Sequence, residues 1–374
     1  MEIKLSSLPK EERLTLGLRR LFEQYGYSKY RMGKFEEYGL YMENKNFLKS
    51  AGIITFTDMD GRLMALKPDV TLSIVKNAQV GTVEKLYYAE NVYRLAREGH
   101  EYREIGQVGL EYIGGEGLLS EAEVLLLALK SLGAISRQYV LDISHMGLIS
   151  ALFRQLRIPE EQTEPMLAAL SQKNRHELKS RALAVGLLEE DAERLCRLTA
   201  LPAAFPEALR QARSTFETPE TVPLFDNLDS LYGALASLGL GSRLRLDFSI
   251  VNDLSYYNGL IFQGYVAEAP RAVLAGGRYD NLLHRFGKPQ GAIGFALYLD
   301  EVGRAFHGHP EYDVDTLLLY TEEQPVRLVL QAVEQLTKQG ISVRAELERP
   351  EGIRWRRAVR LRDDGALSPE GGAK

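Results

Sequence analysis

Hydrophobic residues recur with two different periods along the first 145 positions of the chain. Leu14, Leu16, Leu18, Leu21 and Phe22 form an apolar face, which predicts an amphipathic helix that begins near Pro9 and ends near Gly26. Segments with strand-like composition follow in pairs, and the turn signal DMDG at 58–61 makes the first pair a hairpin. The predicted strands are that hairpin over 53–66 and then 85–95, 102–113 and 138–143, with helices over 68–75 and 121–132.

The pattern changes between residues 149 and 240, where strand signals disappear and helical spacing dominates. Breaks at the prolines of positions 159, 202, 206 and 219 divide this region into short helices. We interpret it as a helical insertion. Strand character returns afterwards, over 243–248, 260–266, 273–275 and 292–298.

Residues beyond 310 predict a small, truncated α/β piece. A strand over 316–320, a helix over 324–339 and a strand over 341–345 suit a right-handed crossover. Residues 363–374 are rich in Gly, Ser, Pro and Asp, and we expect this tail to be disordered. The whole pattern indicates an α+β protein: a core over 1–310 on a mostly antiparallel sheet, interrupted at about 149–240, followed by the piece over 311–362.

Composition excludes some classes of function. A formal net charge of −5 argues against broad electrostatic capture of nucleic acid. The single cysteine, Cys196, cannot form an internal disulfide, which fits a cytoplasmic protein, and its place in an amphipathic segment predicts a buried structural thiol. The first residues do not look like a signal peptide, and the longest apolar stretch contains Lys130 and is too short to span a bilayer.

Polar residues on predicted strands and helix ends are the candidates for a binding site. Gln107 and Glu111 share one face of a strand, where polar groups are costly unless they line a wet or occupied pocket. Asp69, in LKPDVT at 66–71, carries a carboxylate that could pair with an ammonium group, although an acid also suits the first turn of a helix.

Two further segments have both a structural and a functional interpretation. Tyr256 and Tyr257 could form the wall of a pocket for a ring, with one of them facing it, or they could simply pack in the core. The glycines of AGGRYD at 275–280 allow close approach to a ligand, or they form a hairpin turn with Asp280 capping the next helix.

Four segments in order resemble the motifs of histidyl-tRNA synthetases. LKPDVT resembles the family's LRPEGT, and Tyr93-Arg94 with YREIGQVGLE at 102–111 resembles its second motif, FRxE followed by RxxxQxGxE. VNDLSYYNG at 251–259 resembles VRGLDYY, and AGGRYD followed by GAIGFALYLDE at 291–301 resembles the third motif. The resemblance implies a class II synthetase-like core, and GKFE at 33–36 stands where that family forms its dimer interface.

The resemblance also assigns roles to positions. It implies that Asp69, Thr71, Gln107, Glu111, Tyr256 and Tyr257 bind histidine, and that Arg94 and Arg278 bind phosphate or another anion. Two family arginines are replaced, one by Asn252 and the one that holds the ATP phosphates by Glu301. An anionic side chain cannot cradle a triphosphate, so histidine is expected to bind but not to be activated.

This combination of retained and lost groups is similar to the regulatory subunits of ATP phosphoribosyltransferase, a family related to the synthetases. The resemblance implies a non-catalytic protein of histidine biosynthesis, without a cofactor or metal. Such a protein forms a synthetase-like dimer, pairs with a short-form catalytic subunit and confers feedback inhibition by histidine. No metal-ligand spacing is apparent, since His307 and His309 lack a third partner.

Two alternatives stay open at this stage. An active histidyl-tRNA synthetase would need other groups in place of Asn252 and Glu301, and histidine-dependent exchange of pyrophosphate into ATP would reveal it. A synthetase-like RNA-binding regulator would use the basic cluster Arg354–Arg362, which is also typical of a solvated strand or a protein contact. Membrane association is not expected.

Overall fold

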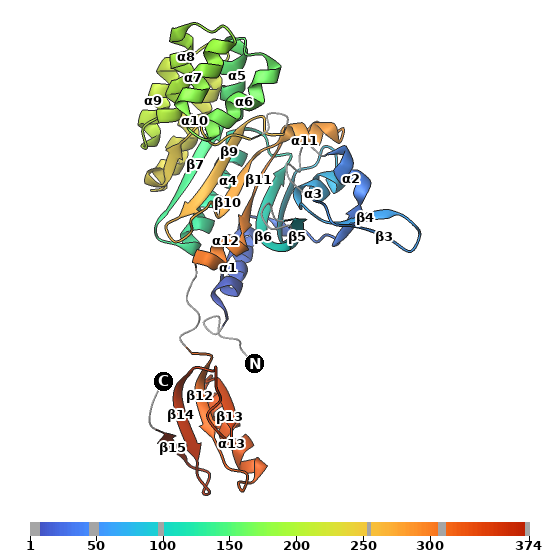
Figure 1. Ribbon diagram of the computed structural model, residues 1–374, viewed down its shortest axis with the longest axis vertical. Coiled ribbons are helices and arrows are strands. Elements are labelled where there is room, and N and C mark those ends of the chain that lie inside the picture. Colours follow the sequence, from blue (N-terminus) through green and yellow to red (C-terminus); the bar gives the residue numbers. More distant parts are fainter. Residues whose placement is uncertain (1–7, 45–51, 96–100, 253–255, 306–311, 371–374) are drawn as a thin grey trace. The chain divides into compact units, whose positions relative to one another are not determined.

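The computed structural model describes residues 8–44, 52–95, 101–252, 256–305 and 312–370 (Figure 1). The chain divides into two compact units, Met1–Phe306 and His307–Lys374. Several motif positions lie outside the described residues: the loop at 96–100, residues 253–255 of the third segment, and His307 and His309.

An eight-stranded sheet forms the centre of the first unit. The strands in spatial order are β1 (Ser28–Lys29), β5 (Glu84–Leu95), β6 (Tyr102–Ile113), β11 (Ala292–Tyr298), β10 (Leu274–Arg278), β9 (Leu260–Val266), β7 (Tyr139–His145) and β8 (Leu244–Leu246). Only the two outermost pairs, β1 with β5 and β7 with β8, are parallel. The predicted α+β core on a mostly antiparallel sheet is therefore confirmed.

Two helices, α1 (Lys10–Gln24) and α4 (Gly117–Ile135), pack on one face of this sheet. Their apolar sides form the main core with the residues of β6 that point toward them, such as Val108 and Leu110. Leu16 was expected on the buried side of the first helix but is 41% exposed, because the buried stripe follows Leu14, Leu18 and Phe22. The other face of β6 is left for the polar residues.

Smaller elements complete the first unit, and most of them lie on the right of the view in Figure 1. These are β2 (Phe35–Glu37), α2 (Tyr38–Glu43), β3 (Thr55–Thr57), β4 (Leu63–Leu66), α3 (Thr71–Asn77) and α11 (Asp280–Arg285), and α12 (Leu299–Ala305) follows β11. The strands β2, β4 and β3 form a three-stranded antiparallel sheet that contains the predicted hairpin. A second apolar cluster joins α3 and α11 to the large sheet.

The helical insertion forms a bundle beyond one end of the large sheet (Figure 1). It consists of α5 (Met146–Gln155), α6 (Glu160–Ser171), α7 (Arg175–Ala184), α8 (Glu189–Cys196), α9 (Phe205–Phe216) and α10 (Val222–Ser237), with short 3-10 turns at Arg197–Ala200 and Gly241–Arg243. Prolines stand just before α6 and inside the first turns of α9 and α10, where a missing N–H costs nothing. Cys196 is buried, as the sequence predicts.

The second unit carries a four-stranded sheet in the order β13 (Val343–Glu346), β12 (Val314–Leu319), β14 (Trp355–Leu361) and β15 (Leu367–Glu370), together with α13 (Val326–Lys338). The parallel pair β12–β13 with α13 between them matches the predicted crossover. The prediction of a disordered tail over 363–374 is wrong for the described part, because residues 367–370 pair with β14 and Glu370 forms an ion pair with Arg360. The composition of this Gly- and Pro-rich segment indicated disorder, so the sequence did not predict this edge strand.

Two other expectations need correction. Gly276 and Gly277 do not form a hairpin turn but lie within β10, opposite Phe295 and Gly294 of β11. Asp280 does not cap a helix; its Oδ1 accepts a hydrogen bond from the Ala292 backbone N–H at 2.8 Å. Of the helices in the described ranges, none is long and apolar enough to cross a membrane.

Candidate functional site

A buried carboxylate on the central strand β6 organises the site. Glu111 is 2% exposed. Its Oε1 accepts a hydrogen bond from Thr71 Oγ1 at 2.8 Å, and its Oε2 accepts one from the Tyr279 hydroxyl at 2.5 Å. Burial raises the pKa of Glu111 from 4.5 to about 8, against the lowering effect of the Tyr279 and Thr71 hydrogen bonds. At neutral pH this group therefore holds a proton.

A second carboxylate, Asp69, stands at the start of α3. Its Oδ1 accepts a hydrogen bond from the Leu72 backbone N–H at 2.9 Å, so it binds the first turn of the helix. Its Oδ2 lies 3.7 Å from Nη2 of Arg94, whose Nε donates to the Pro68 carbonyl at 2.7 Å. Burial raises the pKa of Asp69, and the Arg94 guanidinium opposes that shift. Arg94 and Asp69 are thus brought together, and an anion at Arg94 would compete with Asp69.

Aromatic rings pack together beside Glu111. The rings of Tyr256 and Tyr257 lie 4.1 Å apart at 77°, and Tyr256 stacks on Tyr279 with 5.8 Å between ring centroids. The expectation that only one of these tyrosines faces the site assumed a strand, but neither residue lies on a strand and the two rings pack against each other. Burial raises the pKa of all three hydroxyls, so they stay protonated and able to donate.

Glycines on the flanking strands make room for these side chains. A Cβ on Gly294 would lie 1.8 Å from Glu111 Oε2, and a Cβ on Gly277 would lie 2.7 Å from the Tyr257 ring. Gly109, on the same face of β6 as Glu111, has the ring of Tyr88 against it in the same way. Any larger residue at these three positions would displace the groups of the site.

Gln107 also belongs to this face of β6. It is 4% exposed and pairs in register with Tyr298 of β11. The structure therefore gathers Asp69, Thr71, Gln107, Glu111, Tyr256 and Tyr257 around one face of the sheet, on which the sequence had placed only Gln107 and Glu111. Sequence reasoning missed Tyr279 and Gly294 as site residues, although both stand inside the segments singled out by their glycines.

Arg278 takes part in an internal ionic network. Its Nε lies 2.9 Å from Asp280 Oδ2 and its Nη1 lies 3.5 Å from Glu121 Oε1. Glu121 in turn accepts a hydrogen bond from Asn227 of α10 at 2.8 Å, which ties the insertion to the large sheet. The anion-binding role of Arg278 stays a prediction, and any anion there would compete with two carboxylates.

Both replaced arginine positions, Asn252 and Glu301, are half-buried. Glu301 occupies the first turn of α12, where the preceding Asp300 accepts a hydrogen bond from the Gly106 backbone N–H at 3.3 Å. Lys67, 1% exposed, is paired with Glu90 at 2.5 Å. Around Asp69, the described cations therefore already face carboxylates. Over the described ranges, no group of three or more His, Cys, Asp or Glu side chains is arranged to hold a metal ion.

Comparison with known proteins agrees with this geometry. Residues 2–302 match the family model for histidyl-tRNA synthetase. An ATP phosphoribosyltransferase regulatory subunit from Desulforamulus reducens is 31% identical over 353 residues, covering 90% of this chain and 86% of the relative. A protein of the same name from Clostridium botulinum is 28% identical over 82% of this chain and 75% of its own length.

Solved structures show the same fold. A Bacillus halodurans protein described as an ATP phosphoribosyltransferase regulatory subunit/histidyl-tRNA synthetase superimposes with a TM-score of 0.75 at 25% identity, over 92% of this chain and 91% of that one. A Nostoc histidyl-tRNA synthetase gives a TM-score of 0.74 at 18% identity, over 96% and 92% of the two chains. The latter likeness concerns the fold alone.

The raised pKa of Glu111 makes stability depend on pH. The folded state holds this proton more tightly than the unfolded state, so the free energy of unfolding falls as pH rises from 4.5 through about 8. The total decrease in the free energy of unfolding has an upper bound on the order of 5 kcal/mol, at about 1.4 kcal/mol per pKa unit. Urea unfolding between pH 5 and 9 measures this dependence. The free energy of unfolding of Glu111→Gln should fall clearly less with rising pH than that of the unchanged protein.

The matched control is Glu104→Gln, which changes an exposed carboxylate on the same strand. It should follow the pH dependence of the unchanged protein. Equal slopes for Glu111→Gln and the unchanged protein would show that Glu111 is ionised in the folded state throughout.

Proposed function

Because the chain belongs to the family of ATP phosphoribosyltransferase regulatory subunits, which share the histidyl-tRNA synthetase family model, we propose that it supports a separate catalytic subunit of that enzyme and makes it sensitive to histidine. The observation that carries this proposal is the composition of the site. Thr71 and Tyr279 donate hydrogen bonds to Glu111, and Tyr256 stacks on Tyr279, while Asn252 and Glu301 replace the two cations needed for chemistry on ATP.

The charges argue against nucleotide chemistry in this site. Transition states of phosphoryl and nucleotidyl transfer are stabilised by fixed cations, and each is worth on the order of several kcal/mol of barrier. Arg94 remains but already faces Asp69, and Glu301 adds a negative charge where a positive one is needed. The protein thus has no activity of its own in this proposal and needs no cofactor.

Histidine fits the remaining groups. Its ammonium lies against Asp69 and Glu111, with Thr71 and Gln107 beside it and the imidazole against Tyr256 or Tyr257. A cation beside Glu111 favours the ionised carboxylate, so this side chain loses its proton when histidine binds. Binding is then linked to proton release, and affinity rises with pH from neutrality up to about 8.

Calorimetry tests this site directly. Histidine should bind the purified chain, and the observed enthalpy at pH 7 should change with the ionisation enthalpy of the buffer, because protons are released. Glu111→Ala should weaken binding tenfold or more, because an ammonium ligand is lost, and should remove most of the buffer dependence.

Glu104→Gln serves again as the control and should bind like the unchanged protein. Unchanged affinity in Glu111→Ala would place the histidine sensor elsewhere in the protein or at its junction with the catalytic subunit. Binding without proton release would contradict the ionisation of Glu111 on binding, whatever the affinity.

The partner in this proposal is a short-form catalytic subunit, which condenses ATP with phosphoribosyl pyrophosphate. A solved complex from Thermotoga maritima, described as an ATP phosphoribosyl transferase (HisG:HisZ) complex, has the same fold with a TM-score of 0.63 at 21% identity, over 77% of this chain and 97% of that one. Coupling of about 1–3 kcal/mol between histidine binding and catalytic activity suffices for useful feedback. We place this assembly in the cytoplasm and not at a membrane.

Reconstitution distinguishes this function from its alternatives. Mixing the chain with a short-form catalytic subunit should raise phosphoribosyltransferase activity, and histidine should then inhibit it five- to hundredfold. The chain alone should not form histidyl adenylate. Histidine-dependent exchange of pyrophosphate into ATP at a substantial rate would contradict the proposal and support an active synthetase.

Self-association is the second part of the proposed assembly. The three-stranded sheet exposes a set of large apolar side chains, in which Phe35 is 52%, Phe56 39% and Leu63 48% exposed. The rings of Phe35 and Phe56 lie 5.2 Å apart and form one surface. Exposed apolar groups gathered in one place are typical of an interface. We assign this surface, the β2–β3–β4 surface, to a synthetase-like dimer.

A charged substitution on this surface should separate the dimer, because a buried unpaired charge is costly. Sedimentation of Phe35→Asp and Phe56→Asp should show mostly monomer at micromolar concentration, where the unchanged protein is a dimer. Leu188→Asp, at a 74% exposed leucine of the insertion, is the control and should stay dimeric. Dimers of unchanged stability in both phenylalanine variants would exclude this surface.

A further inference from the structure

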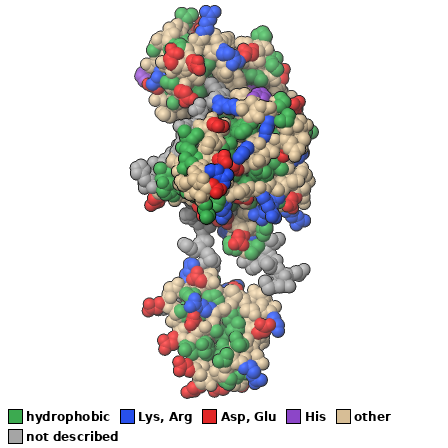
Figure 2. Space-filling model, turned by 90° about the vertical axis from the view of Figure 1, so that its right-hand side faces the viewer, with side chains coloured by type: hydrophobic (Ala, Val, Ile, Leu, Met, Phe, Trp, Pro, Cys, Tyr) green, Lys and Arg blue, Asp and Glu red, His purple; other side chains and the backbone are tan. Residues whose placement is uncertain are grey.

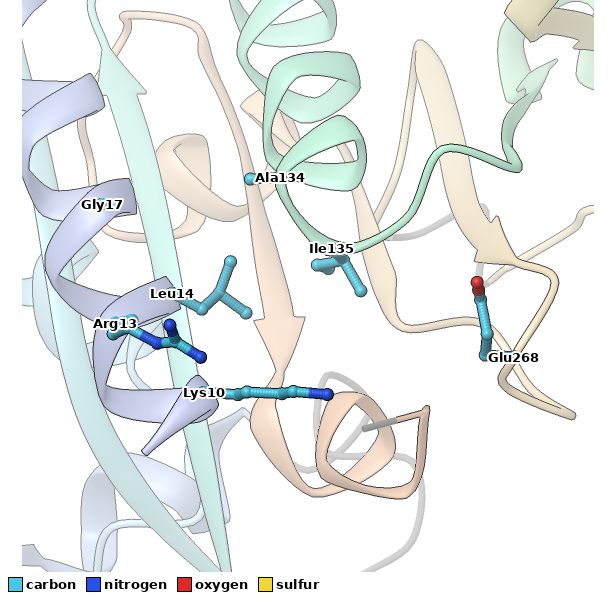
Figure 3. A pocket seen from close by; sticks show the side chains of 7 residues that line it. All are labelled: Lys10, Arg13, Leu14, Gly17, Ala134, Ile135 and Glu268. Carbon is cyan, nitrogen blue, oxygen red and sulfur yellow. The ribbon is translucent and has the colours of Figure 1, made fainter. Parts of the chain in front are cut away.

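A cavity of about 570 Å³ lies away from the candidate site, between the first turns of α1 and the end of α4. Figure 3 shows Lys10, Arg13 and Leu14 of α1 on one side, Ala134 and Ile135 at the end of α4, and Glu268 across from them. Its volume falls within the range of about 300–1,000 Å³ that is typical of small-molecule sites. Neither the family relationship nor the proposed function gives this cavity a role.

Positive and negative side chains lie on opposite sides of this α1–α4 cavity. Lys10 and Arg13 stand on the α1 side, whereas Glu268 accepts a hydrogen bond from Ser136 Oγ at 2.9 Å on the other side. The half-buried guanidinium of Arg13 makes no hydrogen bond or ion pair within the described part of the chain. A half-buried arginine with unused donors beside a cavity is suited to an anionic group, which it can bind through two parallel hydrogen bonds.

A glycine in the wall provides a second, independent observation. Gly17 lies inside α1, where glycine weakens a helix relative to alanine. Its backbone does not have a positive φ, and a Cβ built on it would meet no atom within 4 Å. Neither conformation nor crowding therefore requires glycine here. Its effect is to leave open the space that a side chain would fill.

We propose that the α1–α4 cavity binds a small organic phosphomonoester, with its phosphate on Lys10 and Arg13 and an apolar body against Leu14 and Ile135. Two cations on one side match a dianion, and the fork of arginine fits two phosphate oxygens. The apolar side chains between the charged ends match a ring or hydrocarbon body. Glu268 repels the anion from the far end and so sets the direction in which the ligand lies.

Calorimetry with phenyl phosphate as the probe tests this site in the full chain. Two variants remove it in different ways: Arg13→Gln removes the anion contact, and Gly17→Met fills the cavity without changing any charge. Both should weaken binding at least tenfold. Glu268→Gln keeps an acceptor for Ser136 but removes the repulsion, so it should tighten binding.

The matched control for Gly17→Met is Gly233→Met, at an exposed helical glycine of α10 that also has no atom within 4 Å of its built Cβ. It should bind phenyl phosphate normally, and both methionine variants should melt at or above the temperature of the unchanged protein. Inorganic phosphate should bind at least tenfold more weakly than phenyl phosphate.

Three results would overturn the proposal. The first is no binding of phenyl phosphate at millimolar concentration, and the second is equal affinity in Gly17→Met and the unchanged protein. The third is equal affinity for inorganic and phenyl phosphate, which would leave only a simple anion contact. None of these measurements depends on histidine or on the catalytic subunit, so the proposed function can fail or hold separately.

Discussion

The burial of one carboxylic acid in the middle of an antiparallel sheet is the constraint on which the site depends. Glu111 lies on β6 between β5 and β11, and it has two hydroxyl donors, Thr71 and Tyr279, within 2.8 Å. Taking such a group out of water is costly, and the protein reduces this cost with those two hydrogen bonds and with a proton. The helix that carries Thr71 and the strand that ends before Tyr279 must therefore meet at Glu111. Gly294 must also stay small.

The need to compensate buried carboxylates also explains how the cations of the site are distributed. Arg94 faces Asp69, Lys67 faces Glu90, and Arg278 lies between Asp280 and Glu121. Breaking a buried pair by removing one partner is strongly destabilising, because it leaves an uncompensated charge. These cations stabilise carboxylates of the protein itself. A triphosphate would have to compete with those carboxylates, whereas an amino acid with its own ammonium adds a positive charge beside Asp69 and Glu111.

Sequence patterns predicted the elements well where periodicity was long and uniform, as in β5, β6 and the helices of the insertion. They failed where an element is short, or where its formation depends on contacts with residues distant in sequence. The strand β15 is stabilised by its pairing with β14, which local composition does not encode. The placement of Tyr257 beside Tyr256 depends on Gly277 of β10, where a side chain would meet the Tyr257 ring. Motif spacing identified six of the proposed ligand positions, but the pairing of Arg94 with Asp69 and the role of Tyr279 appear only when the chain is folded.

In the proposed function, the positions of Asn252 and Glu301 explain how the groups for chemistry on ATP can be absent while those for an amino acid and the fold are kept. Asn252 and Glu301 are half-buried and do not belong to the main apolar core, so exchanging residues there leaves the core packing of Val302 and its neighbours intact. Glu111 and Tyr279 are different, because they are buried and bonded to each other across three strands. Removing either leaves a cavity or an unsatisfied group in the sheet, at a cost of about 1–3 kcal/mol for the hydrogen bond alone. The groups assigned to the ligand are therefore held by the stability of the fold itself, while the groups needed for nucleotide transfer can be lost at little structural cost.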